Sequence, residues 1–182
     1  MKKSRTQGFT LIELMIVVAL LGLLSIVGVP TYRSIMVTNE LAYTTNELII
    51  ALKRARGQAI ERGIDVRVCS STDEATCSGV AGNWNSGWLV YADVDGDGLV
   101  DEADGELVFV ADVSSTTQLT IAPTNVIHDV FIDFARTGTL AAGVAASFHI
   151  CSGFATDGYP RREINISVSG DVSLTKNKAV TC

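Results

Sequence analysis

The chain has 182 residues, a length that accommodates one domain and a membrane segment. It carries 14 Lys and Arg against 20 Asp and Glu, a formal net charge of −6, which disfavours free-standing nucleic-acid binding because each phosphate contact requires a cation. With 47% hydrophobic and 19% charged residues, it is too apolar to be intrinsically disordered. The four cysteines indicate an oxidising compartment.

The N-terminus has the pattern of a membrane anchor. Residues 1–8 carry three cations and no acid, and the apolar run that follows, residues 9–29, carries Glu13 as its single charge. A helix of about 20 residues spans about 30 Å, the thickness of a bilayer's hydrocarbon core. No small-residue cleavage site follows the run, which favours a retained single-pass anchor over a secretory signal peptide. The leading cations predict that residues 1–8 are cytoplasmic and that everything after Val29 lies on the outer side of the membrane.

Glu13 is unusual within this apolar run. An ionisable side chain inside a membrane helix costs about 2.5–3.5 kcal/mol on insertion scales, so it requires either a partner or a position near the head groups. The sequence GFTLIEL at residues 8–14 resembles the processing site of type IV pilins and pseudopilins. The resemblance implies that a prepilin peptidase cleaves between Gly8 and Phe9 and methylates the new N-terminus. It also implies that Glu13 pairs with the N-terminal amine of a neighbouring subunit during assembly.

The helix is predicted to continue beyond the membrane over residues 30–62. Apolar residues recur there at helical spacings (Leu41, Leu48, Leu52, Ala55 and Ala59), which predicts an amphipathic segment that packs on a sheet. Gly63 is a natural C-cap. By resemblance, Gly22 and Pro30 match positions where pilin helices loosen or kink. The basic cluster at residues 53–56 suits either nucleic acid or the helix macrodipole, and we favour the macrodipole.

After Gly63 the hydrophobic pattern changes to period two, which is typical of β-strands. The first strand is predicted over residues 64–69. Further strands are predicted over residues 86–92, 106–112, 117–122, 128–135, 146–151, 163–169 and 171–175. We therefore predict an α+β protein in which a long N-terminal helix, transmembrane and then amphipathic, packs on an antiparallel β-sheet domain at residues 63–182.

Two motifs in the β domain narrow the family. The sequence WNSGWLVYAD at residues 84–93 and the sequence FARTG at residues 134–138 resemble the GspH/FimT family of H-type minor pseudopilins. The resemblance implies a type IV pilin-like fold and a structural subunit of the inner membrane. Its partners would be the prepilin peptidase and, through the N-terminal helix, other pilin or pseudopilin subunits. Two roles fit: a minor pilin that primes the type IV pilus at its tip, or a minor pseudopilin of a type II secretion system.

The four cysteines allow three pairings. We predict Cys69–Cys77, which closes a short polar loop, and Cys151–Cys182, which ties the C-terminus to a core strand. The crossed pairings would leave the loop or the terminus unsecured. Zinc binding is disfavoured, because structural sites use closely spaced cysteines or histidines, whereas the two predicted pairs are separated by eight and 31 residues.

Catalysis and direct DNA binding are both disfavoured. The sequence contains no G-x-S-x-G, H-E-x-x-H or P-loop motif, and no required cofactor is indicated. Some FimT-type pilins bind DNA, and the resemblance associates this with a G-R-x-R element near the C-terminus. The matching site here begins Gly170-Asp171 and contains neither arginine. We therefore expect no direct contact with nucleic acid.

An acidic segment after the WNSGWLVYA strand has the spacing of a calcium loop. Carboxylates fall at loop positions 1, 3, 5, 9 and 12, with a carbonyl ligand at position 7; these residues are Asp93, Asp95, Asp97, Asp101 and Asp104, and Leu99. Calcium would neutralise the clustered charge, with an affinity at the weak extracellular end of roughly 10⁻⁴–10⁻³ M. The alternative is a solvated hairpin turn, for which Asp-Gly is a favoured sequence.

Overall fold

The computed structural model describes residues 9–80, 83–95, 100, 105–112, 119–124, 130–152 and 161–176. The chain comprises two compact units, Met1–Met36 and Val37–Cys182. The sequence predicted a finer division of the chain, with boundaries at residues 8, 29 and 62. The helix ends at the last of these, Arg62. The boundaries at residues 8 and 29 stay predictions.

One long helix, α1 (Leu11–Arg62), forms the N-terminal third of the chain. It ends where the sequence predicted, because Gly63 adopts a left-handed φ of 70° and its amide donates a hydrogen bond of 3.0 Å to the Ala59 carbonyl. The helix continues without interruption through Gly22 and Pro30. Loosening at these two positions therefore stays a prediction.

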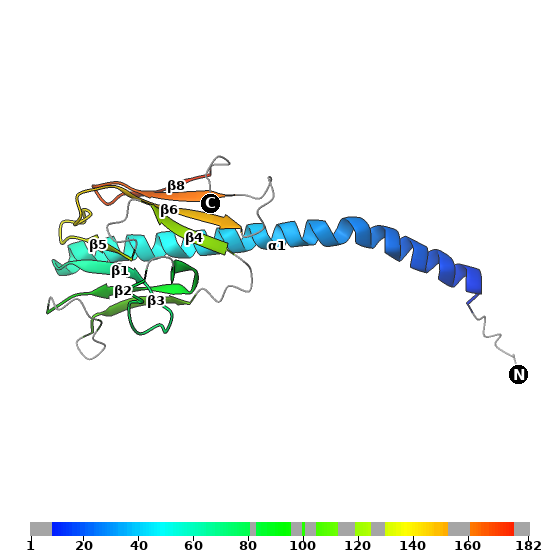
Figure 1. Ribbon diagram of the computed structural model, residues 1–182, viewed down its shortest axis with the longest axis horizontal. Coiled ribbons are helices and arrows are strands. Elements are labelled where there is room, and N and C mark those ends of the chain that lie inside the picture. Colours follow the sequence, from blue (N-terminus) through cyan, green and yellow to red (C-terminus); the bar gives the residue numbers. More distant parts are fainter. Residues whose placement is uncertain are drawn as a thin grey trace, which may run out of the picture. The chain divides into compact units, whose positions relative to one another are not determined.

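The apolar line predicted for the second half of α1 is buried. Leu41, Leu48, Leu52, Ala55 and Ala59 are all fully buried in the main hydrophobic core. The same core includes side chains from both sheets of the β domain, and in Figure 1 this part of α1 passes between them. The spacing read from the sequence thus identified the face of the helix that packs.

Within the described residues, eight strands form two antiparallel sheets of four strands each. The first sheet has the order β3-β2-β1-β5 and the second the order β4-β6-β7-β8. Their bounds are β1 (Val66–Ser70), β2 (Gly87–Ala92), β3 (Leu107–Asp112), β4 (Leu119–Thr124), β5 (Phe131–Phe134), β6 (Ala146–Ser152), β7 (Arg162–Ile166) and β8 (Val172–Thr175). Every predicted strand overlaps an observed one. The predicted β-sheet domain is in fact divided into two sheets.

Alternation along the strands of the first sheet produces two apolar clusters. On β2, Trp88 and Val90 face α1 and belong to the main core. Leu89 and Tyr91 face the opposite way and form a second, smaller cluster with Cys69 of β1. The disulfide loop and the Arg67 ion pair, described below, lie on this outer face.

Candidate functional site

The start of α1 places Phe9 and Glu13 at a capped helix N-terminus. The backbone N–H of Glu13 donates to the Thr10 hydroxyl at 3.3 Å, and the N–H of Leu14 donates to the Thr10 carbonyl at 3.2 Å. Thr10 and Glu13 therefore have the spacing of a capping box, and an acid in the first helical turn suits the macrodipole. Phe9, just before the cap, is 82% exposed. Gly8 lies outside the described residues, so cleavage and the Glu13 pairing stay predictions.

The first unit exposes an extended apolar surface. Its large apolar side chains between Leu11 and Leu24 are 46–76% exposed. Contiguous apolar surface of this size marks a site of protein or membrane contact. Within the described part of the chain, no helix meets the combined length and hydropathy criteria of a membrane span.

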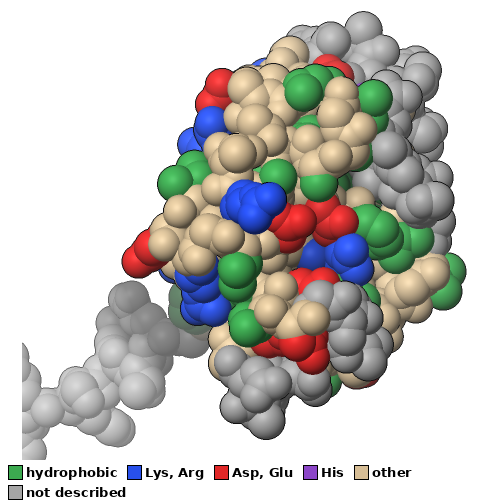
Figure 2. Space-filling view, turned by 90° about the vertical axis from the view of Figure 1, so that its left-hand side faces the viewer, with side chains coloured by type: hydrophobic (Ala, Val, Ile, Leu, Met, Phe, Trp, Pro, Cys, Tyr) green, Lys and Arg blue, Asp and Glu red, His purple; other side chains and the backbone are tan. Residues whose placement is uncertain are grey.

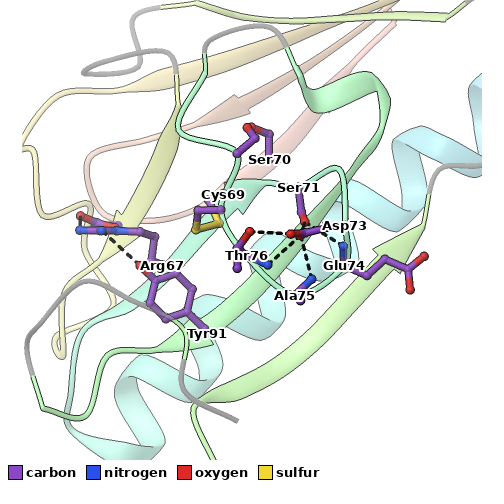
Figure 3. Close-up of a disulfide and its surroundings, with 12 residues drawn as sticks. Arg67, Cys69, Ser70, Ser71, Asp73, Glu74, Ala75, Thr76 and Tyr91 are labelled. Atoms are coloured by element: carbon purple, nitrogen blue, oxygen red, sulfur yellow. Dashed lines mark hydrogen bonds and ion pairs between the residues drawn. A yellow bond between two sulfur atoms is a disulfide. The ribbon is translucent and has the colours of Figure 1, made fainter.

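A disulfide joins Cys69 to Cys77, the pair predicted from the sequence (Figure 3). Cys151 is also disulfide-bonded. Its predicted partner Cys182 lies outside the described residues, so that pairing stays a prediction. No described cysteine is free, in agreement with an oxidising compartment.

Hydrogen bonds to Asp73 order the loop between Cys69 and Cys77. Its carboxylate accepts from the Thr76 hydroxyl at 2.7 Å, from the backbone N–H groups of Thr76 and Ala75 at 2.8 and 3.0 Å, and from the Ser71 hydroxyl at 3.1 Å. These bonds, led by the Thr76 hydroxyl, hold the pKa of Asp73 well below its usual range. The loop is thus fixed at both ends by the disulfide and in its interior by one carboxylate.

An ion pair on the outer face of the first sheet links β1 to β5. The Arg67 guanidinium donates to both carboxylate oxygens of Asp133, at 2.6 and 3.0 Å, and to the Tyr91 hydroxyl at 3.2 Å. It also lies 4.1 Å above the centre of the Phe131 ring. The bond to Asp133 raises the pKa of Arg67, while burial raises the pKa of Tyr91. The Arg67 guanidinium therefore stabilises the first sheet, and its raised pKa keeps it charged, so it cannot act as a base.

Of the acidic segment at residues 93–104, the structure describes residues 93–95 and residue 100. Asp97, Leu99, Asp101 and Asp104 lie outside the described residues. Asp93, Asp95 and Glu106 each offer a carboxylate oxygen, and these oxygens lie within 4.8 Å of one another. Glu106 is 1% exposed and accepts a 2.8 Å hydrogen bond from the Val94 N–H. The calcium site stays a prediction, to which the structure adds one candidate ligand, Glu106.

Glu106 could not have been selected from the calcium-loop spacing, because it falls beyond position 12 of the loop. The available signal was its place one residue before β3, the strand that pairs with β2 in the same hairpin. The Ala92 N–H donates to the Glu106 backbone carbonyl at 2.8 Å, which brings Glu106 beside the end of β2. Asp93 follows that end directly.

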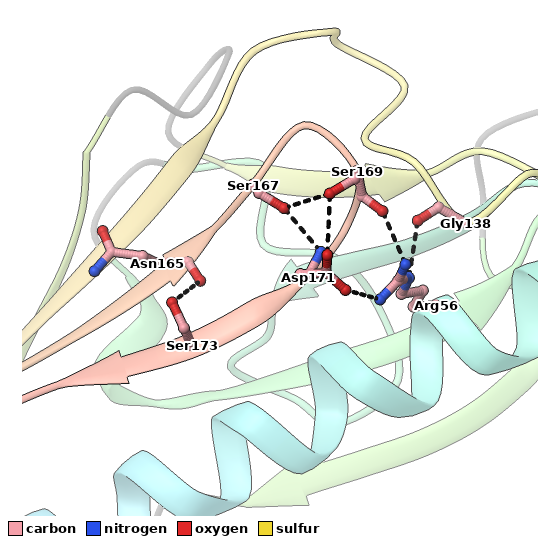
Figure 4. A network of polar contacts seen from close by, with 7 residues as sticks. All are labelled: Arg56, Gly138, Asn165, Ser167, Ser169, Asp171 and Ser173. Carbon is pink, nitrogen blue, oxygen red and sulfur yellow. Dashed lines mark hydrogen bonds and ion pairs between the residues drawn. The ribbon is translucent and has the colours of Figure 1, made fainter.

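The site that matches the DNA-binding element holds an internal ion pair (Figure 4). Arg56 of α1 donates to Asp171 Oδ1 at 2.6 Å, to the Ser169 carbonyl at 2.9 Å and to the Gly138 carbonyl at 3.1 Å. Arg56 holds the pKa of Asp171 below its usual range, aided by the Ser169 hydroxyl. The macrodipole interpretation of the basic cluster is incomplete for Arg56, which binds a specific carboxylate.

Charges of both signs are interspersed on the face of the β domain seen in Figure 2. Acidic side chains lie next to Lys and Arg side chains at the centre of this view. A duplex or single strand of nucleic acid is held by a continuous positive surface, because the phosphates repeat along the backbone. The coloured part of this face has no such surface.

The long helix, the two antiparallel sheets and the capped N-terminus define a pilin-like protein. The model of the family "Type II transport protein GspH" matches residues 44–171, and the model of the prokaryotic N-terminal methylation motif matches residues 3–29. The chain belongs to the GspH family.

Solved structures with this fold include two minor subunits. The type IV minor pilin FimU of Pseudomonas aeruginosa aligns with a TM-score of 0.56 and 22% identity, over 78% of this chain and 92% of that chain. The minor pseudopilin EpsH from the type 2 secretion system of Vibrio cholerae aligns with a TM-score of 0.51 and 11% identity, over 75% of this chain and 97% of that chain. These likenesses show a shared pilin-like fold.

Sequence relatives include fimbrial proteins. The type IV major fimbrial protein FimA of Dichelobacter nodosus is 36% identical over 103 residues, which cover 52% of this chain and 56% of the relative. A fimbrial protein of Pseudomonas aeruginosa is 32% identical over 116 residues, which cover 61% of this chain and 70% of the relative. The match thus spans little more than half the length of the Dichelobacter relative.

Proposed function

We propose that this chain is a minor type IV pilin, held in the inner membrane by residues 9–29, processed and methylated, and built into the pilus, where it primes assembly at the tip. The observation that carries the proposal is a methylation motif at residues 3–29 followed by a GspH domain at residues 44–171, with one helix running through both. The C-terminal domain is periplasmic before assembly and extracellular afterwards. The role is structural, with no catalytic step.

The geometry at the start of α1 supports the assembly step. Cleavage after Gly8 creates a new amine at Phe9, immediately before the helix N-terminus. Glu13 lies in the first turn, exposed to its surroundings. In an apolar environment a lone carboxylate is costly, and the amine of an incoming subunit neutralises it. The exposed apolar side chains from Leu11 to Leu24 provide the membrane contact before assembly and the helix contact after it.

A second candidate is the H-type minor pseudopilin of a type II secretion system. The GspH family match and the likeness to EpsH favour it as much as the likeness to FimU favours the pilus. Both roles use the same anchor and the same glutamate. A DNA-uptake receptor, the alternative from a different class, is disfavoured because both arginines of the matching element are missing, and Asp171, which stands in place of one of them, is paired with Arg56.

Deletion of the gene separates the two structural roles. A minor pilin predicts loss of surface pili and of twitching motility, with exoprotein release unchanged and with both losses restored by the intact chain. Loss of exoprotein release with normal twitching would overturn the pilus assignment in favour of the secretion system. A mutant normal in both would overturn both.

A further inference from the structure

The edge strand β3 lacks the features that usually protect the edge of a sheet. Among the described strands it pairs with β2 on one side only, and the other edges of the two sheets are β4, β5 and β8. β4 contains Pro123, and β5 and β8 are only four residues long. Edge prolines and short edges discourage the addition of a further strand. β3 has six residues, and the first five, LVFVA, include no charge, proline or glycine.

The pairing of β2 determines which backbone groups of β3 point away from the sheet. In an antiparallel ladder, successive residues of a strand direct their N–H and C=O groups to opposite sides. The Gly87 carbonyl accepts from the Ser71 N–H, so the odd-numbered residues of β2 bond to β1 and the even-numbered residues bond to β3. Val90 is in register with Phe109, and the register is regular from there to the end of β3. Phe109 therefore bonds to β2, whereas the N–H and C=O of Val110 point toward the open edge.

A groove of about 480 Å³ lies beside the start of this strand. Its volume is within the range of sites that hold small ligands or single side chains. One wall is formed by Leu107 and Val108 of β3, and the other by residues in the last turns of α1, namely Arg54, Gly57, Gln58, Glu61 and Arg62. Gly57 contributes no side chain, and a Cβ added to it would meet nothing within 4 Å. A strand placed along β3 would thus find room for its side chains on the α1 side.

Two arginines are held at the groove by contacts within the chain. Arg54 lies over the phenylalanine ring of β3, 4.7 Å from its centre. Arg62 donates to the side-chain oxygen of Gln58 at 2.8 Å and to the Gly105 carbonyl at 3.3 Å. Glu61, the carboxylate among the lining residues, accepts from Gln58 Nε2 at 2.9 Å. The groove therefore presents two positive charges against one negative charge, which favours an anionic side chain in the partner.

We propose that the open edge of β3 binds an extended acidic segment of a partner protein, which adds to the first sheet as a further strand and places a carboxylate beside Arg54 and Arg62. The backbone of the segment pairs with the outward N–H and C=O groups of β3, including those of Val110. Its side chains alternate, so those on the α1 side enter the groove and the others extend the outer apolar face. The site is separate from the N-terminal apolar segment, and it is the same whether the chain serves a pilus or a secretion system.

Short peptides test the strand addition on the full chain in detergent micelles. The probe is a fluorescently labelled hexapeptide, Val-Thr-Glu-Thr-Val-Thr, whose alternation places the glutamate and both valines on one side of the strand. We expect saturable binding, measured by fluorescence anisotropy. The peptide with lysine in place of glutamate should bind about tenfold or more weakly, because its charge opposes Arg54 and Arg62. Glutamate peptides with N-methyl groups on either alternating set of amides should distinguish the set that pairs with β3, and methylation of that set should abolish binding.

Val110 and Phe109 provide matched positions within β3. Peptide binding should slow amide hydrogen exchange at Val110, whose N–H points to the open edge, and leave exchange at Phe109 unchanged, because that N–H already bonds to β2. Val110→Pro removes the outward donor without removing a bond to β2, so the variant should fold and lose peptide binding. Val110→Thr keeps the donor and is the matched control. Arg54→Glu should reverse the preference and favour the lysine peptide.

Four results would overturn the proposal. Equal binding of all the N-methylated peptides would exclude strand addition, and equal binding of the glutamate and lysine peptides would exclude a role for the arginines. Failure of the wild type to bind the glutamate peptide, or unchanged exchange at Val110, would exclude the site. Concentration-dependent dimers in sedimentation, present in the wild type and abolished by Val110→Pro, would show that the edge holds a second copy of this chain instead of an acidic partner.

Discussion

Replacement of Arg56 by alanine is expected to loosen the junction between the two sheets. Arg56 projects from α1 and binds the Gly138 carbonyl, which follows β5 of the first sheet, and the Ser169 carbonyl, which lies between β7 and β8 of the second. A net contribution of about 1 kcal/mol for each of these hydrogen bonds gives about 2 kcal/mol for Arg56→Ala. For a chain of this size that corresponds to a fall of about 4–8 °C in the unfolding midpoint.

The ion pair with Asp171 is expected to add little to this effect. The Asp171 side chain is 71% exposed, and water screens such pairs. Asp171→Asn is therefore the matched control, and its unfolding midpoint should stay close to that of the wild type. Thermal unfolding of the full chain in detergent, followed by circular dichroism, measures all the variants. A loss for Asp171→Asn as large as that for Arg56→Ala, or no loss for Arg56→Ala, would refute the assignment of the stability to the carbonyl contacts.

Gly170→Ala tests the same junction from the opposite side. Gly170 has a left-handed φ of 81°, and a Cβ there would lie 2.0 Å from the Gly138 carbonyl oxygen. Because the obstacle is backbone, the two turns must separate to admit the methyl group. The variant should lose more stability than Arg56→Ala. A smaller loss would show that the two turns are not held at this distance.

The remaining predictions concern assembly, pH and calcium. Glu13→Gln keeps a side chain able to complete the capping box, whereas Glu13→Ala does not. Equal loss of both variants from filaments would show that assembly needs the charge of Glu13. Selective loss of Glu13→Ala would show that assembly needs the helix cap. The pKa of Asp73 is lowered from 3.8 in the folded state, so its contribution to stability is complete well above pH 3.8 and is lost as the pH falls below it. A urea titration against pH should show this fall, and Asp73→Asn should show a smaller one. Calcium at millimolar concentration should raise the unfolding midpoint of the wild type and leave that of Asp95→Ala unchanged. Calorimetry should report an affinity of roughly 10⁻⁴–10⁻³ M. No heat of binding and no shift of the midpoint in the wild type would contradict the calcium site and favour the solvated hairpin turn.

The elements of the fold could be predicted because their signals are local. The helical spacing from Leu41 to Ala59 and the change to period two after Gly63 depend on neighbouring residues alone, and the structure confirms both. The division into two sheets depends on which strand edges meet. For example, β1 pairs with β5 across more than 60 residues of sequence, and no periodicity specifies such a partner.

The same distinction separates the predicted site residues from those that were missed. Phe9 and Glu13 belong to one short motif and could be selected by resemblance. Arg56 meets Asp171 from 115 residues away, and Glu106 reaches the acidic segment only when β2 and β3 pair.

The most direct test of the central claim is the mass of the N-terminal peptide of this chain in sheared, purified filaments. A minor pilin predicts a peptide that begins at Phe9 and carries one methyl group on its amine, present in the filament fraction of wild-type cells and absent when Gly8 is replaced by a bulkier residue. Recovery of the chain only in membranes, with Met1 intact in cells that contain an active prepilin peptidase, would contradict it.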